Sequence, residues 1–306
     1  MEQMKSGNHE DKTIESATIF DQKINDHFPK QFIWPKDHLS QTSTEKLNEQ
    51  VIDLQGFLSH DEEATLLADN LVKESCLSHG FFQVVNHGVD PALLALAHEH
   101  GRAFFKLPLT EKLKCKQKEG SVVGFACAHA QRFREKLPWK ELLTFEYHEN
   151  GTDEVTAEFF NALGSQYKET GLIFQKFCRS MNKLALDIME LLEISLGVDG
   201  HKHNYYRQLF EDSVSIALSN GKYKSCLHRV SANRYKPRLS LAFFLCPKGD
   251  RELKAPQDLV DKDGRKEYPD FTWEEFLQFT QKNHRADENT LDEFTKWLLS
   301  SKKPNA

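Results

Sequence analysis

The stretch from Ser219 to Pro247, SNGKYKSCLHRVSANRYKPRLSLAFFLCP, constrains the fold more than any other part of the chain. A Ser-Asn-Gly turn leads into residues 223–228, and a polar connection separates these from the apolar run 241–245. Apolar runs separated by turn-forming residues are typical of neighbouring β-strands. The sequence therefore predicts two strands of a β-rich domain in this stretch.

Three polar side chains stand out here: His228 precedes the connection, whereas Arg238 and Ser240 follow it. Side chains two residues apart on a strand point to the same face, so Arg238 and Ser240 are expected to act together. A guanidinium group matches a carboxylate and a hydroxyl completes the hydrogen bonding, while imidazole is a good ligand of transition metals. The alternative is a surface arginine beside a serine and a lone histidine at a strand edge, and these three residues do not decide between the two.

Size and composition exclude several classes of protein. A chain of 306 residues is long enough for one large domain or two smaller ones. A hydrophobic content of 39% with 22 phenylalanines favours a packed globular protein over a disordered one. The net charge of -6 lacks the basic excess expected of a nucleic-acid-binding protein.

The cysteines and the N-terminal sequence bear on location. The six cysteines form no CxxC motif and no close pair, which is typical of reduced thiols inside a cell. The start of the chain lacks the apolar core of a signal peptide, and no apolar run of 18 residues occurs. We therefore expect a cytoplasmic protein that is monomeric if folded, with no membrane or nucleic-acid partner.

Periodicity predicts an α+β protein in three parts. Residues 1–30 are polar and are expected to form a disordered arm, 31–200 a helix-rich region, and 201–306 a β-containing region with C-terminal helices. The basic run 106–118 is interpreted as a solvated charged surface. The expected elements are strands at 51–54 and 81–85, helices opening at the Ser59–Glu62 capping sequence and at Pro91, a long helical signal over 153–196, and a helical pair over 274–298.

Several segments together resemble plant 2-oxoglutarate-dependent dioxygenases, and within them the gibberellin 20-oxidases. They are Phe32-Ile33-Trp34-Pro35, Gly80 to Val89, Lys136-Leu137-Pro138-Trp139-Lys140-Glu141 and Tyr268 to Trp273. The third is similar to the LPWKET box attributed to gibberellin binding, with Leu142 in place of the final threonine. The resemblance extends from about residue 30 to residue 298.

This resemblance implies a double-stranded β-helix (jelly-roll) fold and an oxidoreductase that oxidises gibberellin at carbon 20. Fe(II) would be the cofactor, and 2-oxoglutarate the co-substrate that is decarboxylated to succinate. His228 would be one iron ligand, and Arg238 and Ser240 would hold the distal carboxylate of 2-oxoglutarate. The implied gibberellin-binding residues are Leu137, Pro138, Trp139, Lys140 and Glu141.

The chain departs from this family at one point. The family's Asn-Tyr-Tyr-Pro-Pro stretch and the His-x-Asp motif that gives its other two iron ligands are both missing upstream of His228. The sequences on either side of Ile216/Ala217 match the family, and the gap is on the order of sixty residues, or several short strands. Other donors have poor context: His9 and Asp11 in the polar arm, and His201, His203, Glu211 and Asp212 near a helix end.

Two consequences are expected. A site with one protein ligand cannot hold Fe(II) against water, so no catalytic residue is assigned and the chain is predicted to be inactive as it stands. A jelly roll without several strands would expose strand edges and apolar faces, which favours low solubility. The alternatives are a shortened isoform or mis-joined gene product that at most binds a ligand or partner, and a dioxygenase for another metabolite such as a flavonoid.

Overall fold

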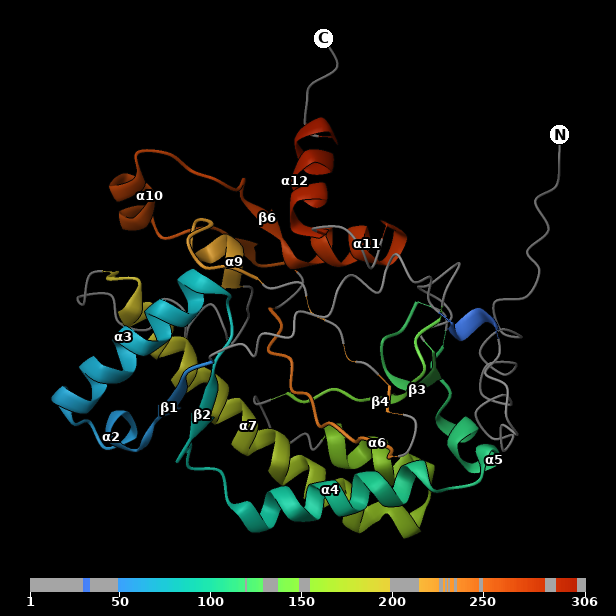
Figure 1. Cartoon of the computed structure of the whole chain (residues 1–306). Coiled ribbons are helices and arrows are strands. Elements are labelled where there is room, and N and C mark those ends of the chain that lie inside the picture. Colours follow the sequence, from blue (N-terminus) through green and yellow to red (C-terminus); the bar gives the residue numbers. More distant parts are fainter. Residues whose placement is uncertain are drawn as a thin grey trace, which may run out of the picture. The chain divides into compact units, whose positions relative to one another are not determined.

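The computed structural model describes residues 30–33, 49–118, 120–128, 137–148, 155–198, 215–225, 228, 230, 232–233, 236–247, 250–283 and 290–301. The chain, whose helices and strands are labelled in Figure 1, divides into two compact units, and each unit is formed from several stretches of sequence. The first unit comprises residues 1–45, 91–179 and 232–241, and the second comprises 46–90, 180–231 and 242–306. The divisions expected from the sequence, at residues 30 and 200, stay a prediction.

Helices predominate in both units. The first unit holds η1 (Lys30–Phe32), α4 (Pro91–Phe105), α5 (Leu109–Lys112), η3 (Leu113–Cys115), β3 (Gly124–Cys127), β4 (Glu141–Thr144), α6 (Val155–Leu163) and η4 (Ser165–Tyr167). The second holds β1 (Val51–Asp53), α2 (Gln55–Leu58), α3 (Glu62–Ser78), β2 (Gln83–Val85), α9 (Ser215–Leu218), β5 (Glu252–Leu253), α10 (Gln257–Asp263), β6 (Phe271–Thr272), α11 (Trp273–Asn283) and α12 (Thr290–Ser301). The longest helix, α7 (Lys168–Ser195), contributes residues to both units. No helix among the described residues is both long and apolar enough to cross a membrane.

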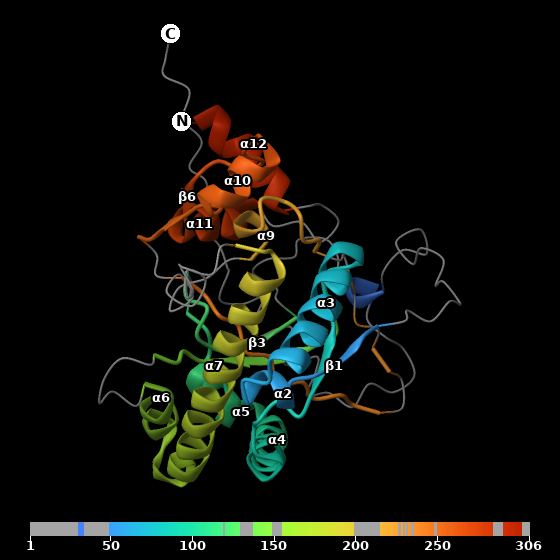
Figure 2. The ribbon, with the colours of Figure 1, turned by 90° about the vertical axis from the view of Figure 1, so that its left-hand side faces the viewer.

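In the first unit, α4 and α6 lie beside the N-terminal half of α7 (Figure 2). The rings of Phe160 on α6 and Phe174 on α7 stack with centroids 5.3 Å apart. The residue at position 101 of α4 is glycine because other chain segments approach closely there: a Cβ would lie 3.2 Å from Leu239 Cδ2 and 3.9 Å from Phe174 Cζ. This contact sets residues 236–241 against α4.

The long helical signal over 153–196 proves to be two helices, α6 and α7, with a break between them. Gly164 occupies the break with a φ of 139°, a conformation that side-chain-bearing residues rarely adopt. The amphipathic periodicity was correctly assigned to helix, but the glycine interrupts it, so the single helix predicted there is wrong.

In the second unit, β1 and β2 form a parallel pair, and α3 packs against β1. The capping sequence before α3 acts through Asp61, whose carboxylate accepts a hydrogen bond from Ala64 N at 3.0 Å. The helices predicted to open at the Ser59–Glu62 sequence and at Pro91 are therefore present, the first with Asp61 and not Ser59 as its N-cap. The strands predicted at 51–54 and 81–85 are also present but shorter than expected.

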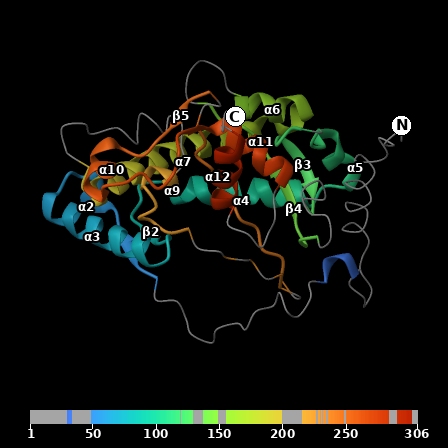
Figure 3. The same cartoon turned by 90° about the horizontal axis from the view of Figure 1, so that it is seen from above.

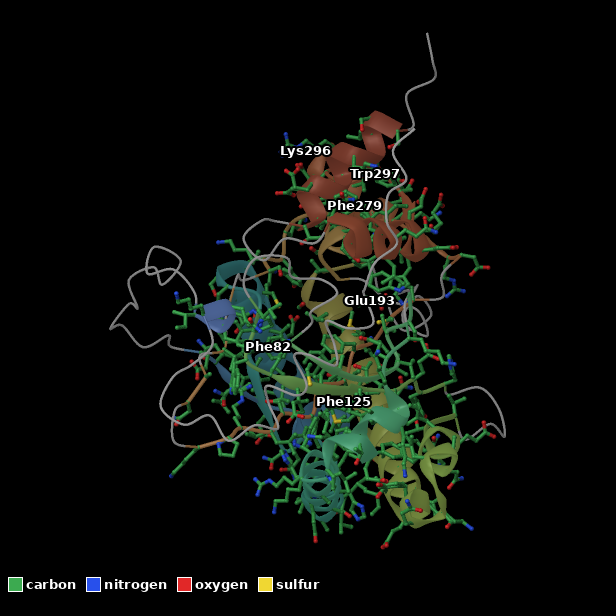
Figure 4. The ribbon with its side chains drawn as sticks, turned by 90° about the vertical axis from the view of Figure 1, so that its right-hand side faces the viewer. Phe82, Phe125, Glu193, Phe279, Lys296 and Trp297 are labelled. Carbon is green, nitrogen blue, oxygen red and sulfur yellow. The ribbon has the colours of Figure 1, made fainter. Side chains whose placement is uncertain are left out.

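An aromatic cluster joins α11, α12 and β6. Phe294 is fully buried, and its ring centroid lies 5.0 Å from that of Phe271 and 5.5 Å from that of Phe279. Phe279 and Trp297 lie next to one another across the two helices, with centroids 5.5 Å apart (Figure 4). The C-terminal helical pair predicted from the sequence is therefore present and has its own core.

The β-structure of the described residues consists of three separate two-stranded sheets, β1–β2, β3–β4 and β5–β6. The α+β assignment holds, but the strands predicted over 223–228 and 241–245 are wrong in so far as these residues are described: none lies in a strand. From 239 to 246 the side chains nevertheless alternate between half-buried and exposed, and Phe244 is 80% exposed. The burial of the side chains thus alternates as it would in a strand, but no strand is formed among the described residues because a strand requires a hydrogen-bonded partner.

A polar node follows α9, where the Ser-Asn-Gly turn was predicted. Asn220 is 3% exposed; its amide donates to Asp263 Oδ2 and to Arg265 O at 3.0 Å each, and its carbonyl accepts from Glu267 N at 2.9 Å. Lys222 Nζ lies 2.8 Å from Asp263 Oδ1. The hydrogen bond from Lys222, then that from Asn220, holds the pKa of Asp263 below its usual range. The node thus ties the turn to the end of α10.

We expect Asp263→Asn to remove part of the pH dependence of stability. A carboxyl group whose folded pKa is lowered stabilises the fold above its ordinary value of 3.8, and this contribution is lost as the pH falls through the lower folded value. The melting temperatures of the two proteins should therefore differ at pH 6, begin to approach each other below about pH 4, and converge only as the pH falls through the lowered pKa of Asp263. A difference that stays constant across this range would contradict the role given to Asp263.

Candidate functional site

The segment Leu137–Glu141, called the box below, is held by backbone hydrogen bonds in the first unit. Glu141 opens β4 and pairs with Cys127 of the antiparallel strand β3. One residue earlier, Lys140 O accepts a hydrogen bond from Ala128 N at 2.8 Å. The box therefore enters a regular strand at its C-terminal end, which fixes the course of its backbone.

The N-terminal end of the box contacts η1, which lies beside β3 and β4 (Figures 1 and 3). Leu137 N donates to Gln31 O at 2.9 Å, and the rings of Phe32 and Trp139 meet edge to face with centroids 4.8 Å apart. Phe32 is 7% exposed. Phe32, the first residue of the family-like segment Phe32–Pro35, therefore packs against the tryptophan of the box.

The acidic residue of the box forms an ion pair inside the unit. Lys112 Nζ of α5 lies 2.7 Å from Glu141 Oε1, with side-chain exposures of 7% and 22%. The ammonium group also lies 3.5 Å from Phe105 O and 5.4 Å from the centroid of the Phe125 ring. The interpretation of residues 106–118 as a solvated charged surface is therefore wrong for Lys112, which is only 5% exposed.

Arg238 and Ser240 are brought together, as their spacing predicts. Arg238 Nε and Nη2 donate to Ser240 Oγ at 3.0 and 2.8 Å, and both residues are exposed. They lie on the extended segment whose alternate residues Leu239 and Leu241 face Gly101 of α4. The arrangement presents a guanidinium group and a hydroxyl group to solvent, which suits a carboxylate ligand.

The metal donors do not assemble in the described part of the chain. His228 is exposed and belongs to the second unit, whereas the box and Arg238 belong to the first. Among the residues that the structure describes, no group of three or more His, Cys, Asp or Glu side chains could hold a metal ion. The other donors considered from the sequence, His9, Asp11, His201, His203, Glu211 and Asp212, lie outside the described residues. The donors described here do not fit an Fe(II) site.

Sequence reasoning missed two residues of this region as partners of the box. Lys112 lay hidden in a basic run, although its neighbours Leu109 and Leu113 are apolar, which is the signal that this one lysine faces inward. The contact of Phe32 with Trp139 was missed because two residues more than a hundred positions apart leave no local signal of their contact in the sequence.

Comparisons with known proteins identify families and individual proteins that this chain resembles. Residues 50–165 match the family described as non-haem dioxygenase in morphine synthesis, N-terminal, and residues 208–247 match the 2OG-Fe(II) oxygenase superfamily. Gibberellin 20 oxidase 3 of Arabidopsis thaliana is 38% identical over 94% of this chain and 95% of that protein. Gibberellin 20 oxidase 2 of Oryza sativa subsp. japonica is 36% identical over 92% of this chain and 88% of that protein.

Two solved structures have folds similar to that of this chain. The structure of JOX2 in complex with 2OG, Fe and JA matches with a TM-score of 0.70 at 22% identity, covering 91% of this chain and 97% of that chain. A 2OG-Fe(II) oxygenase family protein from Caulobacter crescentus matches with a TM-score of 0.59 at 14% identity, covering 78% of this chain and 100% of that one.

The alignment with the Arabidopsis relative is longer than the part of this chain that it covers. It spans 363 positions and covers 94% of the 306 residues of this chain, so about 75 positions have no counterpart here. This number is of the same order as the gap of about sixty residues expected from the sequence. Fe(II) is the cofactor of this superfamily and 2-oxoglutarate its co-substrate. The identity over nearly the whole chain places it in the 2OG-Fe(II) oxygenase superfamily, as a member of the gibberellin 20-oxidase family.

Proposed function

We propose that this chain carries the ligand-binding elements of an oxidase that acts on gibberellin at carbon 20, and that it does not complete the reaction as it stands. One observation carries the proposal: the box and the Arg238–Ser240 pair are formed, whereas the described residues hold no group of three or more His, Cys, Asp or Glu side chains that could bind a metal ion. Membership of the family indicates which reaction the chain is related to, and the lack of a metal-binding group among the described residues is the reason to expect no turnover.

Arg238 and Ser240 are proposed to bind the distal carboxylate of 2-oxoglutarate. The guanidinium group supplies two N–H donors on one side, and Ser240 already accepts from both. Binding of a carboxylate would redirect these donors to its two oxygens, with the serine hydroxyl as a third donor. The packing of Leu239 and Leu241 near Gly101 holds the backbone between them in place.

The box is proposed to bind the gibberellin. Leu137, Pro138 and Trp139 are half-buried and offer apolar surface, and Lys140 is exposed beside them. These residues suit an apolar ligand with a polar group at one side. Contact with η1 fixes the tryptophan on which such a ligand would rest.

The iron step is where the chain falls short. In the family, Fe(II) bound by two histidines and one carboxylate supplies the oxidation of the substrate. Here His228 is proposed as the remaining ligand, and the sequence holds His-x-Asp only at His9–Asp11, outside the described residues. One imidazole does not outcompete water and buffer for a divalent ion. No step of the reaction is therefore assigned to residues of this chain.

The proposal also covers the domain architecture of the chain, its location in the cell and its oligomeric state. We propose an incomplete jelly-roll core within residues 201–306, a helix-rich region over 31–200 and an arm over 1–30. The chain would be a cytoplasmic monomer, in keeping with free thiols at Cys76, Cys115, Cys127 and Cys178 that are all buried. The TM-scores to solved oxygenases support the fold, while the separate two-stranded sheets support its incompleteness.

The test is to measure binding and turnover separately on the purified full chain. With Fe(II), ascorbate, 2-oxoglutarate and a gibberellin, we expect succinate release no greater than that of His228→Ala. Equilibrium dialysis should still show saturable gibberellin binding that Trp139→Ala weakens about tenfold or more, because the ring is the largest apolar group of the box. Gibberellin-dependent succinate release that His228→Ala abolishes would overturn the proposal of inactivity. Absence of both binding and turnover would instead indicate an inert shortened product.

A further inference from the structure

We infer that Lys112 is the positioning residue of the box, and that Glu141 is its internal anchor and not a group that binds the ligand. The inference deepens the proposed function, since it rests on the box being the gibberellin-binding segment. Lys112 and Glu141 are 29 residues apart in the sequence and meet only through the fold of the first unit.

The surroundings of Lys112 explain why the pair forms. The side chain of Lys112 is 7% exposed, and an ammonium group is costly to bury without an anion. Two neutral groups also lie near it: the carbonyl oxygen of Phe105 at 3.5 Å and the ring of Phe125, whose centroid is 5.4 Å away. Glu141, at 2.7 Å, supplies the compensating charge.

A neighbouring thiol is consistent with a carboxylate held in the interior. Cys127 faces Glu141 across the β3–β4 pair and is 1% exposed. Burial first, and then the charge of Glu141, raises the pKa of Cys127 to about 12, so the thiol stays neutral. The thiol of Cys127 on β3 is therefore not a second anion beside Lys112, and the positive charge of Lys112 compensates the negative charge of Glu141.

The position of Glu141 gives the ion pair its effect on the box. Glu141 is the first residue of β4 and the last of the box, so fixing its side chain fixes the point where the box joins the sheet. Lys112 is itself held, because η3 follows it directly and Lys116 bridges to Phe125 of β3. The opposite end of the box is held by Gln31 through Leu137. The box is thus fixed at both ends, by η1 and by Lys112.

This arrangement also limits the chemistry of the ligand. Because the carboxylate of Glu141 is compensated inside the protein, the box presents no uncompensated negative charge from this residue. An apolar ligand that carries a carboxylate of its own would therefore meet no repulsion from Glu141. If Glu141 instead bound the ligand directly, a hydroxyl or cationic group would be required in the ligand at this position.

The experiment compares Lys112→Met, Glu141→Gln and the double variant in the full chain, with Lys112→Arg as the conservative variant. Lys114→Met is the matched control, because Lys114 forms an exposed pair with Glu111 one turn away. Hydrogen exchange of the peptide covering residues 137–144 reports the box without any ligand. Each single variant should raise its exchange rate about tenfold, whereas the double variant, Lys112→Arg and the control should stay within about threefold of the parent chain.

Gibberellin affinity supplies the second readout. Each single variant should weaken binding about tenfold and the double variant should restore it, since no buried charge is left uncompensated. A double variant that binds as weakly as Glu141→Gln would show that Glu141 contacts the ligand and would overturn the inference. Unchanged exchange in both single variants would overturn it as well. A parent chain that binds no gibberellin refutes the proposed function alone, because the exchange readout still decides the role of Lys112.

Discussion

Inserting the missing segment of a relative between Ile216 and Ala217 should turn this chain into an active oxidase. The segment to insert is the part of Arabidopsis gibberellin 20 oxidase 3 that lies between the matches to these two residues, expected from the sequence to be on the order of sixty residues. It should restore the two missing iron ligands and the missing strands. We expect gibberellin-dependent succinate release to rise by at least about a thousandfold over the parent chain, because an iron site is required for any oxidation to occur.

The structure indicates that the C-terminal side of the junction is ready for such an insertion. The short helix α9 spans the junction, and beyond it Ala217 and Leu218 are 2% and 0% exposed. Ala217 packs in the cluster with Phe271 and Phe294, and Leu218 packs with Leu186 and Met189 of α7. The residues that follow the insertion therefore already have their partners.

The matched control is the same insertion with alanine in place of the histidine and aspartate of its His-x-Asp motif. This control should fold as the insertion does and remain without turnover. His228→Ala in the active insertion should abolish turnover too, which would assign the third ligand. An insertion that folds and binds iron, yet oxidises no gibberellin, would contradict the assignment of the reaction to this framework.

The elements that sequence predicts best here are those whose stability is local. The helix α4 begins at Pro91 and ends near Phe105, as the proline and the apolar periodicity predict. The N-cap at Asp61 is likewise encoded within a few residues. Periodicity gave the type of structure correctly over 153–196, but Gly164 broke the helix because a single backbone conformation outweighs the pattern on either side.

Elements that depend on distant partners could not be predicted in the same way. The apolar run 241–245 has the composition and the alternation of a strand, yet no ladder forms there among the described residues, because pairing requires another segment. The site shows the same limit: Arg238 and Ser240 are two residues apart and were paired correctly, whereas Lys112 and Glu141 meet only in the folded unit. Charge pairing at long sequence separation has no signature in one sequence.

Replacing Phe294 by alanine should destabilise the second unit by about 3–5 kcal/mol, the cost of removing a fully buried phenylalanine. Phe294 is 0% exposed, and its ring centroid lies within 5.0 to 5.8 Å of those of Phe271, Phe276, Phe279 and Trp297. Truncation would leave a cavity among rigid rings that cannot collapse to fill it. The loss should lower the midpoint of unfolding in urea. Tryptophan fluorescence can monitor this unfolding because Trp297 is part of the cluster.

Phe244→Ala is the matched control, because it removes the same side chain from a position that is 80% exposed. Its effect on stability should stay within about 0.5 kcal/mol, as expected of an exposed site. Equal losses for the two variants would mean that the rings of α11 and α12 do not form a core of their own. A large loss confined to Phe294→Ala would show that the C-terminal helices fold around their aromatic cluster although two iron ligands are missing elsewhere, which is the condition under which the insertion between Ile216 and Ala217 can restore activity.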